Sequence, residues 1–268
     1  MKYAAIAATL LAATTLGLVL HAFGQGNAPF VPPNEADTSP ASALDSMPSK
    51  TITNGMVSAK VCLPVPFGFY RSTRFDHAGM ITHITYKDHD YGQYWFVKTS
   101  PDVHNFTYDK DGLVAHPSDV AAGPVEEFAQ NGFEEAGSGG RFLKIGVGIL
   151  KRDNDTYDRF HTYPILTEGT RTTTATKNSI RFTQVIPADA SGYGYVFTKT
   201  VTLVPGKAEL KIEDRLKNTG KKFIDTSVYN HHFMTLSPAR TACNSRPPSR
   251  SPTPGPCPPT WSNSTATA

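Results

Sequence analysis

The feature that most constrains the fold is an alternation of apolar and polar residues with a period of two. The clearest runs lie at residues 57–63, 143–149, 193–203 and 210–216. Successive side chains of a β-strand point to opposite faces of its sheet, so this pattern predicts strands with one buried face. We find no convincing helical pattern of ten or more residues, and Gly206 and Gly220 supply turns between the last three predicted strands, at residues 193–203, 210–216 and 227–236. The sequence therefore predicts an all-β chain, and the number of strands favours a large antiparallel β-sandwich.

The N-terminus reads as a targeting segment. Lys2 precedes an uncharged apolar run at residues 3–20, and Ala22 and Gly24 are small residues at the right spacing for cleavage before Gln25. A membrane anchor is the alternative, since about 18 apolar residues almost span a bilayer. The richness of the run in Ala and Thr favours a signal peptide at residues 1–24. We therefore expect a periplasmic or secreted protein with no stable membrane insertion after cleavage, followed by a disordered Pro/Ser/Ala-rich linker at residues 25–50.

The net charge of +3 comes from the C-terminal tail. Residues 237–268 contain Arg240, Arg246 and Arg250 and no acidic residue, so the rest of the chain is neutral. Because no cluster of Lys and Arg forms a stripe, we expect no nucleic-acid partner.

The tail also differs from the body in pattern, because it is rich in Pro, Ser and Thr and shows no strand alternation. Reading its codons from one base earlier can give apolar strand-like runs and acidic residues. We therefore expect residues 237–268 to be a disordered tail that results from a shifted reading frame. The sandwich of residues 51–236 would then be incomplete at its C-terminus, with the alternative that the tail is a genuine Pro-rich extension.

The cysteines predict neither a metal site nor a disulfide framework. Cys62 stands alone in the body, and Cys243 and Cys257 lie in the tail. We expect no metal and no cofactor.

Residues 87–140 break the alternation and mix aromatic residues, acids, histidines and glycines. Long irregular segments on a β scaffold are often functional loops. Aromatic rings beside carboxylates suit a sugar, because the rings stack on its apolar faces and the acids bind its hydroxyls. Aromatic packing beneath a long loop is the alternative interpretation.

Four short motifs occur in order along the body: "YRSTRFDHAGMITHITY", "GPVEEF", "FLKIGVGILKR" and "VYNHHFMTL". Together they resemble the galactose mutarotase-like superfamily, the aldose 1-epimerases, in a secreted bacterial branch. The resemblance covers residues 51–236. It implies a large antiparallel β-sandwich of the galactose mutarotase-like type that binds sugars in a cleft.

The resemblance assigns the catalytic role to His231, which directly follows Asn230. Strand alternation places His231 on one face with Tyr229 and Phe233, and His232 on the other face with Asn230. In the family reaction an acid protonates the ring oxygen while a base removes the proton of the anomeric hydroxyl, and a histidine suits the acid role. A purely structural hydrogen bond within the sandwich is the alternative for His231.

Other positions match the family pattern less closely. The family places a sugar-binding arginine in the stretch that holds Arg71 and Arg74. Its second histidine, before a Gly-Gly pair, has no counterpart here, and His161 is a candidate replacement. Its general base is a carboxylate nearer the C-terminus, and the tail contains none. The residues expected to bind substrate are Arg71, Arg74, Glu127, His161 and Asn230.

These features predict a carbohydrate-binding protein resembling aldose 1-epimerase that interconverts sugar anomers by acid/base ring opening. The expected partner is a sugar or glycan. A non-catalytic carbohydrate-binding β-sandwich, an inactive truncated homologue and a structural surface domain are the alternatives.

Overall fold

The computed structural model describes residues 45–92, 94, 98–99, 106–109, 112–235 and 260–263. The chain divides into two compact units, residues 1–33 and 34–268, and every described residue belongs to the second. This unit is built almost entirely of β-strands, as the alternation predicted.

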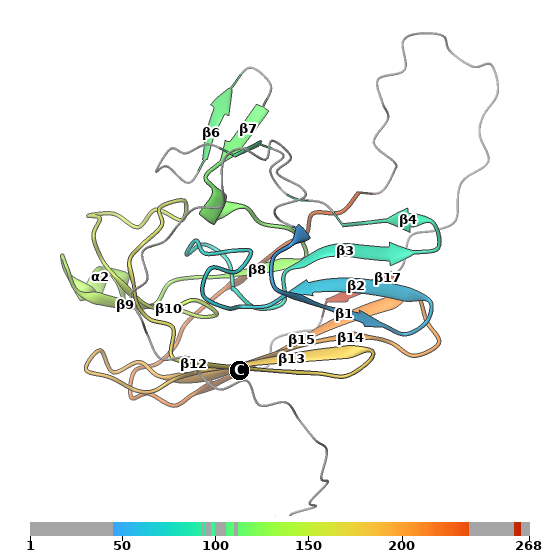
Figure 1. Cartoon of the computed structure of the whole chain (residues 1–268). Coiled ribbons are helices and arrows are strands. Elements are labelled where there is room, and N and C mark those ends of the chain that lie inside the picture. Colours follow the sequence, from blue (N-terminus) through green and yellow to red (C-terminus); the bar gives the residue numbers. More distant parts are fainter. Residues whose placement is uncertain are drawn as a thin grey trace, which may run out of the picture. The chain divides into compact units, whose positions relative to one another are not determined.

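Two antiparallel sheets form the two main layers (Figure 1). The first contains β1 (Ser49–Thr53), β2 (Val57–Cys62), β3 (Ile81–Tyr86) and β4 (His89–Asp90), in that order. The second contains β12 (Thr170–Ala175), β13 (Ser179–Ile186), β14 (Tyr195–Leu203) and β15 (Glu209–Asn218), with β17 (Thr260–Asn263) parallel to β15 at its edge. The fold is therefore the predicted all-β sandwich.

The main core lies between these layers. Ile52 and Ile84 of the first sheet pack in one buried cluster with Ile180 and Val201 of the second. In β14 every second residue is buried: Val201 and Leu203 pack against the first sheet, and Tyr195 and Phe197 pack in a separate cluster with Phe128 and Leu143. Burial of large aliphatic side chains, at about 25 cal/mol per Å² of apolar surface, is the main force that holds the two layers together.

The run at residues 143–149 differs from the prediction of one continuous strand. It forms a hairpin of β9 (Arg141–Lys144) and β10 (Gly148–Lys151), and β11 (Ile165–Thr167) pairs with β10. Gly146 lies in the turn with φ of +79°, and an added Cβ would lie 2.5 Å from Asp76 Cγ. Glycine permits both this backbone conformation and the close approach, so the chain reverses where alternation alone suggested that it continues.

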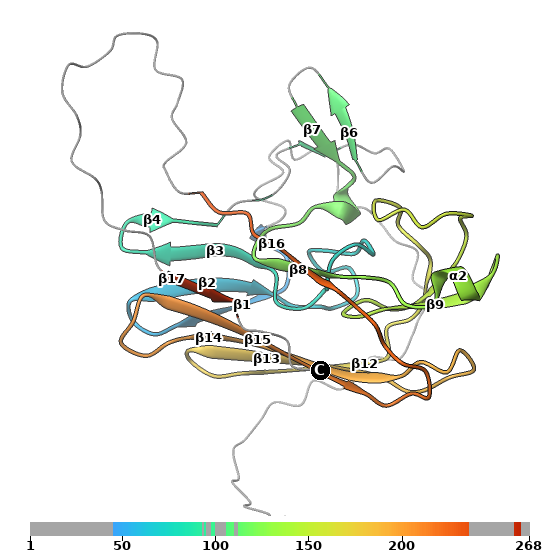
Figure 2. The same cartoon turned by 180° about the vertical axis from the view of Figure 1, so that it is seen from behind.

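The irregular segment holds several short elements. They are β5 (Lys98–Thr99), β6 (Phe106–Asp109), β7 (Gly112–Ala115), the 3₁₀ turn η1 (Pro117–Asp119), β8 (Val125–Phe128) and α2 (Phe133–Ala136). The α-helix α2 has only four residues, which agrees with the absence of a long helical pattern. β8 pairs with β16 (Val228–His231), as the view from behind in Figure 2 shows.

Two strands include residues of the segments expected to be linker and tail. β1 begins at Ser49, and Asp45 accepts a hydrogen bond from Nε2 of His83 at 2.8 Å, so the end of the expected linker belongs to the sandwich. The expected disordered tail contains β17, which pairs with β15 because the edge of a sheet offers unpaired backbone groups. The expected signal peptide at residues 1–24 and most of the tail lie outside the described residues.

No helix within the described ranges has the length and hydrophobicity needed to cross a membrane.

Candidate functional site

The two glutamates of "GPVEEF" lie on opposite faces of β8. Glu126 points toward the sandwich interior, where its Oε2 accepts a hydrogen bond from Nζ of Lys199. Glu127 points to the other face and is only 5 % exposed. The alternation of a β-strand therefore gives neighbouring carboxylates two different environments.

Three cations surround the carboxylate of Glu127. Nε of Arg74 lies 2.9 Å from Oε2, and Nζ of Lys144 lies 3.8 Å from Oε1. Arg159 donates from Nε to Oε1 at 3.0 Å and places one terminal nitrogen 2.9 Å from Oε2. The fork of Arg159 thus grips both oxygens, which is the geometry that arginine offers to a carboxylate.

His231 faces this group from β16. Tyr229 of β16 lies directly opposite Glu127 of β8, and His231 follows two residues later on the same face. The ring of His231 lies 5.4 Å from that of Tyr229 and 4.5 Å from that of Phe233. This confirms the prediction that these three side chains share a face. We call Glu127, Arg74, Lys144, Arg159 and His231 the Glu127 cluster.

Aromatic rings line the Glu127 cluster. The guanidinium of Arg74 lies between two rings, 4.6 Å from the centroid of Phe75 and 4.8 Å from that of Phe160. Arg159 lies 5.8 Å from the ring centroid of Tyr229. These contacts stabilise the cations by cation–π attraction and present apolar surface beside charged groups.

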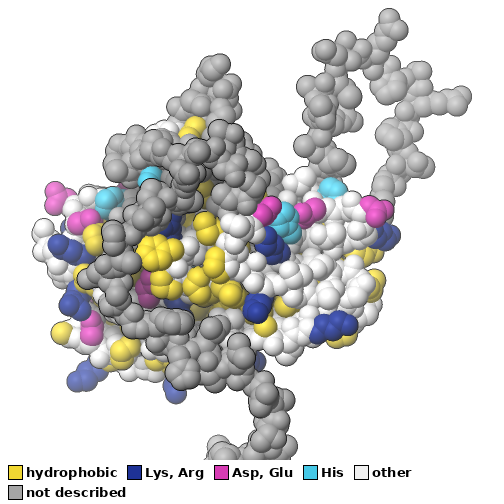
Figure 3. Space-filling model, viewed as in Figure 1, with side chains coloured by type: hydrophobic (Ala, Val, Ile, Leu, Met, Phe, Trp, Pro, Cys, Tyr) yellow, Lys and Arg dark blue, Asp and Glu magenta, His cyan; other side chains and the backbone are white. Residues whose placement is uncertain are grey.

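The outer part of the cluster is accessible. Phe160 is 38 % exposed and Tyr229 is 49 % exposed, whereas the side chain of Lys144 is buried. Figure 3 shows hydrophobic side chains next to charged ones and histidines on one face of the molecule. We call the exposed rings of Phe160 and Tyr229 the aromatic rim. Aromatic rings next to charged groups suit a sugar ring, because the faces of the sugar are apolar and its edges carry hydroxyls.

The positive surroundings also act on the titratable members of the cluster. Burial lowers the pKa of His231, and the charges of Arg74 and Arg159 lower it further, against the opposing effect of Glu127. Burial lowers the pKa of Lys144 to about 8, although Glu127 opposes this change. At neutral pH His231 is therefore mainly uncharged. A neutral imidazole must accept a proton before it can act as an acid.

The structure brings some of the expected substrate-binding residues together and separates others. Arg74, Glu127 and His231 meet in the Glu127 cluster. Arg71 lies beside Asp119, whose charge raises the pKa of Arg71 while burial lowers it. Asn230 is exposed and lies opposite Glu126 in the β8–β16 pair, so it belongs to the other face of that pair.

His161 lies on the loop that precedes β11, next to Phe160 of the aromatic rim. Its Nε2 lies 3.0 Å from Oδ1 of Asp153, and its ring packs edge-on against Tyr163 at 4.6 Å. The loop thus borders the Glu127 cluster, but the described contacts of the His161 ring are with these two residues.

Sequence reasoning missed Arg159 and Lys144 as members of the site. Arg159 lies two residues before His161 in "RFHTYPI", a loop without the periodicity that predicts a direction. Lys144 is the polar partner in an apolar run, where alternation suggests an exposed side chain. In the structure it donates to the hydroxyl of Tyr157 at 2.6 Å beneath Glu127. The aromatic residues Tyr157 and Phe160 on either side of Arg159 are a weak signal that could have pointed to it.

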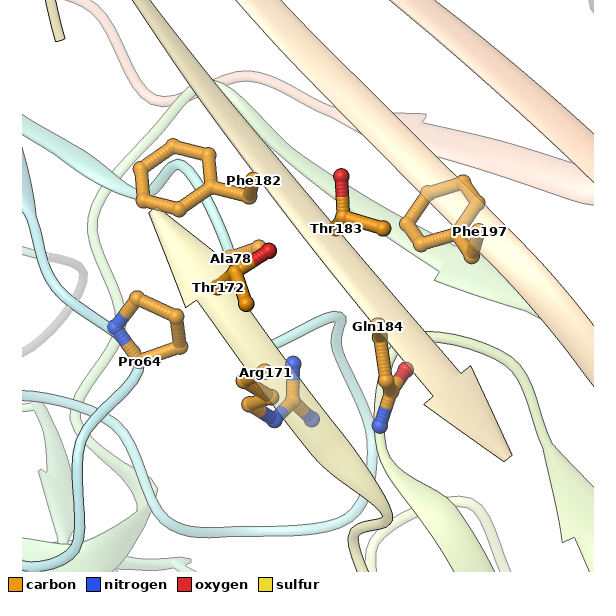
Figure 4. A pocket seen from close by; sticks show the side chains of 8 residues that line it. All are labelled: Pro64, Ala78, Arg171, Thr172, Phe182, Thr183, Gln184 and Phe197. Carbon is orange, nitrogen blue, oxygen red and sulfur yellow. The ribbon is translucent and has the colours of Figure 1, made fainter. Parts of the chain in front are cut away.

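A separate pocket lies beside β12, β13 and β14 (Figure 4). It is lined by Pro64, Ala78, Arg171, Thr172, Phe182, Thr183, Gln184 and Phe197. Its two long polar side chains already bind the backbone, because Arg171 donates to the carbonyl of Gly146 at 2.7 Å and Gln184 to that of Val147 at 3.1 Å. This pocket is therefore part of the packing around the β9–β10 turn.

Within the described ranges, no three His, Cys, Asp or Glu side chains form a group that could hold a metal ion. The chemistry available to the Glu127 cluster is hydrogen bonding, charge and proton transfer.

Comparison with protein-family models, with curated proteins and with solved structures finds no significant match to this chain.

Proposed function

We propose that the protein binds a carbohydrate at the Glu127 cluster and resembles aldose 1-epimerase in using His231 for proton transfer during sugar ring opening. The observation that carries this proposal is the convergence of His231, Glu127 and two arginines beneath an exposed aromatic rim. Rings stack on the apolar faces of a pyranose, and the arginine forks donate hydrogen bonds to neighbouring hydroxyls.

Proton transfer fits the position of His231. An imidazole that is neutral at working pH can take the proton of the anomeric hydroxyl and later return it to the ring oxygen. The ring then opens to an aldehyde, the C1–C2 bond rotates, and the ring closes on the other face. No cofactor is needed, because each step moves only a proton and the electron pair of the C1–O5 bond.

A non-catalytic carbohydrate-binding sandwich is the second candidate, and one observation favours it. Both oxygens of Glu127 are engaged by cations, so neither is available to contact a sugar hydroxyl unless an existing contact is given up. Efficient ring opening needs an acid and a base together. Binding without chemistry would follow if no other group completes the pair.

The test is to measure binding of a pyranose panel by calorimetry and the interconversion of its anomers by NMR exchange spectroscopy. Saturable binding together with faster interconversion supports the enzyme, and binding alone supports the second candidate. If no sugar binds at millimolar concentration, the proposed function is wrong.

We further propose export to the periplasm or the medium after cleavage before Gln25. Intact-mass analysis of the exported protein tests this, because a chain that keeps residues 1–24 would contradict it. For the tail, the nucleotide sequence around the Leu236 codon decides between a shifted frame and a genuine extension.

A further inference from the structure

The Glu127 cluster carries more positive than negative charge. Arg74, Lys144 and Arg159 are three cations that share the single carboxylate of Glu127. His231 adds no negative charge and is mainly neutral near pH 7. The cluster therefore has an excess of two positive charges.

Water screens the three cations to different degrees, because their side chains differ in exposure. The side chains of Arg74 and Lys144 are 10 % and 1 % exposed, whereas that of Arg159 is 45 % exposed. Charges are screened less when they are buried, so the field of the two inner cations is directed toward the open side of the cluster, where Arg159 lies.

Arg159 has donors left to offer. Its Nε and one of its terminal nitrogens contact Glu127, which leaves the other terminal nitrogen of the guanidinium on the exposed side. An oxyanion at this edge would gain charge-assisted hydrogen bonds. Tyr229 lies beside this guanidinium with its ring centroid at 5.8 Å, and Phe160 packs on the neighbouring Arg74.

We infer that the natural ligand of the Glu127 cluster is an anionic sugar, with its negatively charged group against Arg159 and its ring on the aromatic rim. This inference rests on the proposed function and adds the class of substrate to it. A neutral sugar would leave the excess charge of the cluster uncompensated, whereas a uronic acid or a sugar phosphate would balance it. The two kinds of anion share the chemistry that Arg159 recognises.

The experiment compares D-galacturonate, D-galactose 6-phosphate and D-galactose on the full chain by calorimetry at about 50 mM salt. We expect at least one of the two anionic sugars to bind tenfold or more tightly than D-galactose, with a preference that shrinks as salt rises because screening weakens the attraction. A preference for the carboxylate or for the phosphate identifies the source of the charge.

Two variants locate the effect. Arg159→Gln should reduce the ratio between anionic and neutral sugar affinities to threefold or less. Arg181→Gln is the matched control, because Arg181 is exposed on β13 and donates to Thr200 away from the cluster. It should leave that ratio unchanged, and circular dichroism checks that both variants fold.

A second readout follows the charge directly. The NMR titration of His231 should move to higher pKa when the anionic sugar binds, because the new negative charge opposes that of the arginines, and should not rise with D-galactose. Equal or tighter binding of D-galactose overturns the inference but leaves the proposed function standing. If none of the three sugars binds, the inference is overturned, and the pyranose panel decides separately on the proposed function.

Discussion

Replacing Lys199 with Met should destabilise the protein strongly. Lys199 is buried on β14, where its Nζ forms an ion pair with Asp76 at 2.6 Å and donates to Glu126 and to the carbonyl of Ala78. Asp214 lies directly opposite it on β15. Methionine keeps most of the volume of lysine but removes the cation that lies closest to these three acids, and Arg171 then acts on Asp76 only from a greater distance.

The expected loss follows from the number of acids left behind. Removing one partner of a buried ion pair typically costs about 3–5 kcal/mol, because the remaining charge is buried without compensation. Here Asp76 and Glu126 both lose their ion pair with Lys199, and proton uptake reduces the penalty. We therefore expect the free energy of unfolding to fall by about 4 kcal/mol near neutral pH, a large part of the roughly 5–15 kcal/mol of a typical domain.

The loss should depend on pH in a defined direction. Without Lys199 the folded state holds its carboxyl groups at raised pKa, so folding binds protons that the unfolded chain releases. The penalty is then complete well above the ordinary carboxyl pKa of about 4 and shrinks as pH falls. Lys199→Met should lose less stability at pH 5 than at pH 8.

Urea unfolding monitored by circular dichroism at both pH values measures this. Lys211→Met is the matched control, because the side chain of Lys211 on β15 is 41 % exposed and pairs with the similarly accessible Glu213, where such a pair contributes about 1 kcal/mol or less. A loss for Lys199→Met no larger than that of the control, or one that grows as pH falls, would refute the reasoning. If the variant is unfolded at pH 8, adding Glu126→Gln should restore part of the fold.

Three further predictions use other parts of the structure. Burial raises the pKa of Asp214 from 3.8 to about 7, so the folded state keeps a proton that the unfolded chain loses. The free energy of unfolding should therefore fall as pH rises from about 4 to about 7. Asp214→Asn should flatten that pH dependence in urea unfolding, and an unchanged slope would contradict the prediction. His231→Ala should slow anomer interconversion by about 100-fold or more, the usual contribution of a general acid or base. His232 is exposed, so His232→Ala should change the same rate by no more than about twofold. A larger loss of rate for His232→Ala would reverse the assignment. Gly146→Ala should lower the free energy of unfolding by about 1–3 kcal/mol more than Gly55→Ala, as measured by thermal unfolding. Both positions have positive φ, but only at Gly146 would the added Cβ overlap another side chain, that of Asp76. Equal losses would show that Asp76 moves aside freely.

The strand pattern could be predicted from the sequence because it depends on local alternation. β14 buries every second residue, and β2 begins at the residue where its alternation starts. The same local rule placed His231, Tyr229 and Phe233 on one face, and it holds wherever one face of a strand is buried.

The rule failed where a contact distant in sequence decides the conformation. The run at residues 143–149 alternates throughout, but it reverses at Gly146, beside which Asp76 from another part of the chain leaves no room for a side chain. Lys144 looks like a surface residue in the sequence and is buried, because Glu127 and Tyr157 provide partners for its charge.

The candidate site was therefore only partly determined by the sequence. The resemblance of short motifs indicated His231 and Glu127, and alternation separated His231 from His232, since a motif and a strand face can be recognised locally. Arg159 lies on an irregular loop, and only the tertiary structure brings it into contact with Glu127. A loop has no period from which the direction of a side chain can be predicted, so its position depends on the ion pairs and aromatic contacts formed when separate strands are brought together.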